Sequence, residues 1–76
     1  MRLPKLPALN GHNVVAALKK AGFVVERQRG SHVTLLHSEN GLSVTVPLHK
    51  TDLQPGILHS IIRDAGLSTK QFRLLL

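Results

Sequence analysis

The sequence predicts a small α+β fold in which two helices cover one face of a three-stranded antiparallel sheet and a short third helix follows. Two observations lead to this fold class. Apolar residues recur at helical spacing near each end of the 76-residue chain, and between these stretches they alternate with polar residues in three short runs separated by turn residues. Because two helices can cover one face of such a sheet, the other face is expected to be open.

The first helix is predicted over residues 11–21. Asn10 is expected to cap it, because its side-chain oxygen can accept hydrogen bonds from the free backbone N–H groups of the first turn. Gly22 is expected to end it in the left-handed conformation. The prolines among residues 1–9 predict an extended lead-in. One side of the helix carries an apolar stripe, formed by Val14, Val15, Leu18 and Ala21.

Three strands are predicted in the middle of the chain, over residues 23–28, 31–37 and 42–46. The Arg29-Gly30 pair is interpreted as the first hairpin connection and residues 38–41 as the second, since glycine accepts the positive φ that tight turns need. Pro47 is expected to end the last strand, because proline cannot donate a ladder hydrogen bond.

The alternation also predicts which side chains face the core. Phe23 and Val25 are expected on one face of the first strand, and Val33 and Leu35 on the core face of the second. His32, at the head of the second strand, is expected on the opposite, open face.

A crossover loop over residues 48–55 is expected to lead into a second helix over residues 56–65, ended by Gly66. Ser68 is expected to cap the short last helix, and the terminal leucines could fold back or contact a partner. The order α-β-β-β-α is that of double-stranded RNA-binding domains, and residues 1–76 are expected to form a single domain. The apolar stripe of the second helix consists of Ile57, Leu58, Ile61, Ile62 and Ala65.

The chain is strongly basic, with ten Lys and Arg against four Asp and Glu and a formal charge of +6. Such a charge favours polyanionic partners. By itself, however, it is equally consistent with a protein that is basic but binds no polyanion. With no cysteine, neither disulfides nor thiolate metal sites are expected, which suits a reducing cytoplasm. No membrane span or secretory signal is expected, and two phenylalanines are too few for a base-stacking platform.

Five short segments occur in a fixed order along the chain, namely Ala21-Gly22-Phe23, Gly30-Ser31-His32, Pro47-Leu48-His49, Gly56-Ile57-Leu58 and the stretch from Ile61 to Ser68. Gly-Ser-His alone would be a weak signal, but the five segments together, in a basic chain of this length, are a strong one. With them the sequence resembles the HicA toxin family, the small ribonuclease partner of bacterial and archaeal HicA–HicB toxin–antitoxin pairs, and the resemblance runs from about His12 to Phe72.

The resemblance implies a dsRNA-binding-domain-like fold and a toxin of a type II toxin–antitoxin system. It further implies an mRNA-cleaving activity that a HicB-type antitoxin neutralises. The family's catalytic histidine corresponds to His32. The chain departs from the family pattern in the second helix, where Ile57 replaces a usual threonine and His59 a frequent arginine, so substrate contacts are expected to differ there.

RNA can be cleaved by attack of the 2′-hydroxyl on the adjacent phosphorus. Histidine changes charge near neutral pH, so His32 can accept the hydroxyl proton, and general-base help of this kind contributes roughly 10²–10⁴-fold. Arg27, Arg29 or the backbone N–H groups of Gly30 and Ser31 could stabilise the phosphorane. Neither a metal ion nor a small-molecule cofactor is expected, because the open face carries no carboxylate cluster.

His49 and Lys50, in the crossover loop, are expected to contact substrate. His49 could also act as the general acid, or be a loop histidine with a structural hydrogen bond. The three remaining histidines are interpreted as surface residues without metal-ligand spacing, namely His12, His37 and His59.

Two other function classes remain open. One is a non-catalytic module that holds an A-form duplex by its shape. Against it, double-stranded RNA binders generally place a lysine cluster at the start of the last helix, and residues 54–58 contain no lysine. The other is a protein-interaction domain that docks a partner through residues 74–76. If the protein is the nuclease that the resemblance implies, its antitoxin is expected to cover His32 with an acidic surface.

Overall fold

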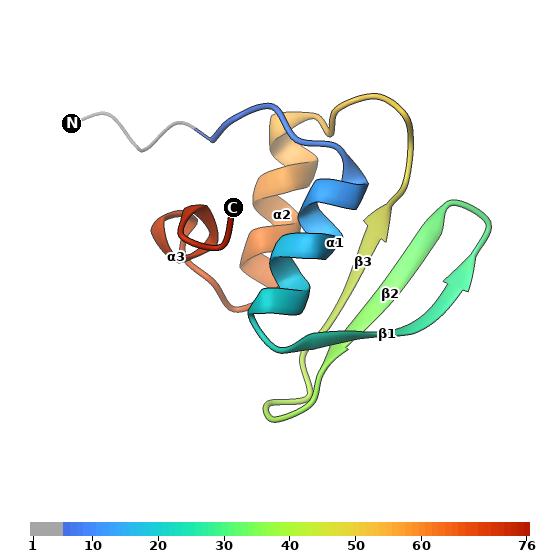
Figure 1. Ribbon diagram of the computed structural model, residues 1–76, viewed down its shortest axis with the longest axis vertical. Coiled ribbons are helices and arrows are strands. Elements are labelled where there is room, and N and C mark those ends of the chain that lie inside the picture. The colour runs from blue at the N-terminus through green and yellow to red at the C-terminus, as the bar shows by residue number, and fades with distance from the viewer. Residues whose placement is uncertain (1–5) are drawn as a thin grey trace.

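The computed structural model describes residues 6–76. The strands form one antiparallel sheet in the order β1-β2-β3, so the α+β, dsRNA-binding-domain-like fold is confirmed. Helices α1 and α2 lie next to each other on one face of the sheet, and α3 lies beside this pair (Figure 1). The elements are α1 (Gly11–Lys20), β1 (Phe23–Arg29), β2 (His32–His37), β3 (Ser43–Pro47), α2 (Pro55–Asp64) and α3 (Thr69–Arg73).

Local hydrogen bonds fix the helix ends much as expected. The Asn10 side chain accepts from the Asn13 N–H at 2.9 Å, and the Asn13 side chain accepts from the Asn10 N–H at 3.2 Å. Ser68 and Gln71 form the same reciprocal cap before α3. Gly22 follows α1 with a φ of 103°, a conformation that favours glycine. The part of the predicted lead-in that falls on residues 1–5 lies outside the described residues.

The core lies between the helices and the covered face of the sheet. Phe72, from α3, is fully buried and extends the core beyond the two main helices. The prediction was wrong for Ile57, whose side chain is 44% exposed, because α2 turns this residue away from the sheet. The buried apolar side chains of the two main helices are Val14, Ala17, Leu18, Leu58, Ile61 and Ile62, and the sheet contributes Phe23, Val33, Leu35, Val44 and Val46.

The first hairpin differs from the prediction by one residue. Arg29 belongs to β1 and pairs with His32, so the connection is Gly30-Ser31. Gly30 has a φ of 56° and Ser31 has no positive φ, a combination typical of a two-residue type II′ turn. In such a turn only the first of the two positions needs glycine. Gly30 fills that position, so Arg29 precedes the turn and remains in the strand.

The last strand runs from Ser43 to Pro47 and still pairs at its proline. Pro47 lies opposite His32, and the next backbone N–H, that of Leu48, donates to the Ser31 carbonyl. Hydrogen-bonded and non-hydrogen-bonded pairs alternate in an antiparallel ladder, so Pro47 occupies a non-hydrogen-bonded position, where its missing N–H removes no ladder hydrogen bond. The start of α1 packs directly on this end of the strand, since a Cβ at Gly11 would overlap the Pro47 carbonyl oxygen.

A β-bulge interrupts β1. Val25 pairs with Leu35 and Arg27 with Thr34, so Glu26 is the extra residue. Strict alternation from the buried Phe23 would direct Arg27 and Arg29 to the helix-covered face. The bulge shifts the alternation by one position and places both arginines on the open face.

His37 is not a surface residue, contrary to the prediction. Its Nε2 lies 3.0 Å from the Ala21 carbonyl oxygen, and its Nδ1 accepts from the N–H groups of Glu39 (3.2 Å) and Asn40 (3.3 Å). The ring also packs edge-on against Phe23, with centroids 5.0 Å apart. His37 therefore ties the end of α1 to the β2–β3 loop.

Candidate functional site

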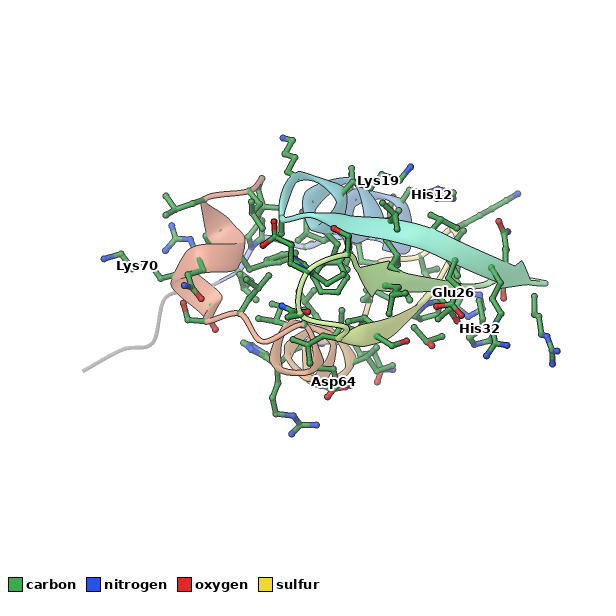
Figure 2. The ribbon with its side chains drawn as sticks, turned by 90° about the horizontal axis from the view of Figure 1, so that it is seen from below. His12, Lys19, Glu26, His32, Asp64 and Lys70 are labelled. Carbon is green, nitrogen blue, oxygen red and sulfur yellow. The ribbon has the colours of Figure 1, made fainter. Side chains whose placement is uncertain are left out.

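An open groove lies where the end of the sheet meets the start of α2. It has a volume of about 400 Å³. Figure 2 shows His32 at the end of the molecule remote from α3 and Lys70. The first residue of β2, the last residue of β3, the loop before α2 and the first turn of α2 all contribute to it. Its lining residues are His32, Pro47, His49, Thr51, Asp52, Leu53, Gln54 and Ile57.

The groove brings together two histidines that are far apart in the sequence. The ring centroids of His32 and His49 lie 6.2 Å apart, with the ring planes at 87°. The ladder explains this proximity. His32 lies opposite Pro47, and the hydrogen bond from Leu48 to Ser31 joins the residues that flank the two histidines.

Both imidazoles are exposed, and their ring nitrogens are free. Within residues 6–76, neither His32 nor His49 makes a side-chain hydrogen bond, whereas His37 uses both ring nitrogens. The structural hydrogen bond that is the alternative role of His49 is therefore not found among the described residues. Free, exposed ring nitrogens can exchange protons with a bound molecule.

The two arginines of β1 lie on the open face beside this groove. Directly paired residues share a face of the sheet, so Arg29 lies next to His32 and Arg27 next to Thr34. Both arginines are exposed. In the part of the chain that the structure describes, the only ion pair joins Arg63 and Asp64, which leaves these guanidinium groups available to an anion.

The remaining predicted residues surround the groove without lining it. Gly30 is exposed at the hairpin turn, where a Cβ would meet nothing within 4 Å, so a ligand could approach its backbone. Ser31 is half-buried, and its carbonyl already accepts from Leu48. Lys50 is exposed in the loop, next to His49 in sequence.

Sequence reasoning missed most of the lining residues, among them Thr51, Asp52, Gln54 and Ile57. The first three belong to a loop without periodicity, and Ile57 matched the core stripe of α2. Asp52 is the one carboxylate in the groove lining. Across residues 6–76, no group of three or more His, Asp or Glu side chains is arranged to hold a metal ion. In the same residues, no helix combines the length and apolar character that a membrane span requires.

The fold and the site define a small basic α+β protein that presents histidines and arginines on and beside an open sheet face. The family model described as the HicA toxin of bacterial toxin–antitoxin systems matches residues 11–67, more than half of the chain. The chain therefore belongs to the HicA toxin family, whose members are in general ribonuclease-type toxins paired with an antitoxin. No curated protein matches the sequence.

Proposed function

We propose that this protein is the toxin of a type II pair and a metal-independent endoribonuclease that cleaves mRNA with His32 as its catalytic histidine. One observation carries the proposal. In a chain of the HicA family, an exposed imidazole stands beside two exposed arginines on an open face, and within residues 6–76 the imidazole makes no hydrogen bond and the arginines form no ion pair. No cofactor takes part in the proposed reaction.

His32 acts as the general base. Its neutral imidazole accepts the proton of a ribose 2′-hydroxyl, and the resulting oxygen attacks the adjacent phosphorus. The reaction passes through a phosphorane whose extra negative charge needs stabilisation. Because the substrate itself supplies the nucleophile, the protein needs neither a covalent intermediate nor a metal-bound water.

Cationic groups and backbone donors around His32 bind the phosphates. Arg29 shares the open face with His32, and Arg27 follows on the same face two pairs further along the strand. Guanidinium groups suit this task because they can donate two parallel hydrogen bonds to a phosphate. We assign the remaining substrate contacts to the backbone of Gly30 and Ser31 and to the side chains of His49 and Lys50.

We further propose that residues 1–76 form one HicA-like domain that acts on mRNA in the cytoplasm. Leu9 and Phe72, which lie on either side of the matched segment, are both buried in the same core and so support a single domain. A HicB-type antitoxin neutralises the toxin by covering His32 with an acidic surface. Such a surface is complementary to the net charge of +6.

Induced expression of the wild type and of His32→Ala tests the proposal, with growth and mRNA integrity followed together. The wild type is expected to arrest growth and degrade mRNA, and His32→Ala is expected to do neither. The purified wild type should cleave RNA in the presence of a chelator. Equal arrest by both proteins would exclude His32 as the catalyst, and a requirement for added metal would contradict the mechanism.

A second candidate is a non-catalytic RNA-binding module, which the dsRNA-binding-domain-like fold favours. Residues 54–58, at the start of α2, offer no lysine to a duplex, and this counts against it. Filter binding of a duplex by wild type and by His32→Ala separates the candidates. A wild type that binds RNA but leaves it intact would favour the module.

A further inference from the structure

We infer that His49 is a second catalytic residue, the general acid that protonates the leaving 5′-oxygen. This inference rests on the proposed ribonuclease function and deepens it, because it assigns a partner to His32 in the same reaction. The observation behind it is the placement of two neighbouring imidazoles in the lining of one groove, from segments separated by 17 positions (49 − 32) in the sequence.

The geometry allows both rings to face one substrate group bound in the groove. A centroid separation of 6.2 Å is too long for a direct hydrogen bond between two imidazoles, and none is formed within the described residues. Each ring nitrogen is therefore free to reach a different oxygen of one phosphodiester. The perpendicular arrangement, at 87°, also directs the two ring edges differently.

Purely structural roles do not account for His49. It is exposed, packs into no core and makes no side-chain hydrogen bond within residues 6–76. The position of its backbone is nevertheless well defined, because the preceding residue, Leu48, is half-buried and bonded to Ser31. An exposed side chain on an anchored backbone next to His32 is suited to act on a bound substrate.

The groove offers few other proton donors. An ionised carboxylate at Asp52 has no proton to give, and the hydroxyl of Thr51 is a weak acid. Arginine does not release its proton in proteins, which excludes Arg27 and Arg29. His49, in its imidazolium form, is the remaining group of the groove lining that can donate a proton near neutral pH without being the base itself.

The proposed step is balanced in atoms and charge. His32 takes the proton of the 2′-hydroxyl, the 2′-oxygen forms a bond to phosphorus, and the bond from phosphorus to the 5′-oxygen breaks. His49 gives its proton to that 5′-oxygen. The products are a 2′,3′-cyclic phosphate and a 5′-hydroxyl end. Proton exchange with water then returns His32 to the neutral form and His49 to the imidazolium.

A substrate with a better leaving group tests the assignment. In a 5′-phosphorothiolate RNA, sulfur replaces the 5′-oxygen and departs without being protonated. His49→Gln is expected to slow cleavage of ordinary RNA by about 10²-fold or more, within the range of general acid catalysis, but to cleave the phosphorothiolate RNA at nearly the wild-type rate. His32→Ala is expected to be impaired on both substrates. His12→Gln, an exposed histidine on α1 outside the groove lining, is the matched control.

Two results would overturn the role of His49 while leaving the proposed function intact. One is full activity of His49→Gln on ordinary RNA. The other is an equal loss on both substrates, which would make His49 a binding or positioning residue. Circular dichroism of each variant establishes that its fold is retained. A wild type inactive on both substrates would overturn the ribonuclease function and with it the present inference.

Discussion

Histidines of the same chain differ in what their ring nitrogens contact. His37 uses both ring nitrogens in contacts with backbone groups of two turns, whereas those of His32 and His49, beside a groove, make no hydrogen bond within residues 6–76. Sequence reasoning assigned His32 to the open face correctly but placed His37 on the surface. The reason is physical, because the partners of His37 are backbone atoms of turns whose positions only the folded chain defines.

This difference predicts that substitution of His37 destabilises the fold, whereas substitution of His32 leaves its stability nearly unchanged. His37→Phe keeps a ring against Phe23 but removes the contacts with Ala21, Glu39 and Asn40, and it is expected to lower the free energy of unfolding by about 1–2 kcal/mol. His32→Ala, an exposed position without hydrogen bonds, is expected to change it by less than about 0.5 kcal/mol. Urea denaturation measures both. If His32→Ala lowered the free energy of unfolding more than His37→Phe, the assignment of a structural role to His37 and not to His32 would be wrong.

Helices and turns that are encoded by residues close together in the sequence were predictable. Features that depend on contacts between two distant segments were not. The caps at Asn10 and Ser68 are encoded within four residues each, so the helices were found within one residue of their observed ends. The bulge at Glu26 depends on how β1 pairs with β2, and no pattern within β1 shows it. The groove likewise combines residues from four segments. Sequence therefore indicated His32 and His49 but not that they lie together.

The packing of α1 against the end of β3 gives a test at the scale of elements. Gly11→Ala is expected to lower the free energy of unfolding by about 1–3 kcal/mol, because the new Cβ overlaps the Pro47 carbonyl and lies 3.1 Å from Leu48 Cα. It should also reduce RNA cleavage at temperatures where the variant is fully folded, since the displaced backbone leads directly to His49.

Gly56→Ala is the matched control for this test. Its Cβ would meet nothing within 4 Å at the start of α2, and alanine favours helix, so stability is expected to stay unchanged or rise by up to about 1 kcal/mol. Thermal unfolding of both variants gives the comparison. Equal stability of the two would show that α1 does not depend on close contact with Pro47.

For the whole molecule, the net charge is expected to strengthen association with the proposed antitoxin. With a charge of +6 and a proposed acidic partner, the affinity is expected to fall at least about tenfold between 0.1 M and 1 M salt, as the Debye length shrinks from roughly 10 Å to 3 Å. Titration calorimetry over this range measures the change. The double variant Arg27→Gln, Arg29→Gln should show a weaker salt dependence, and an affinity that does not vary with salt would contradict an acidic contact surface.

The order of the strands in the sheet has a consequence for how the protein reaches its active form. Each strand pairs with its neighbour in the chain, so the sheet can grow through two consecutive hairpins. Short loops close at little entropic cost, and topologies rich in such local pairings fold quickly. The last pairing of the second hairpin, between Ser31 and Leu48, is also the one that sets His32 beside His49. Completion of the sheet therefore also brings the two histidines of the site together.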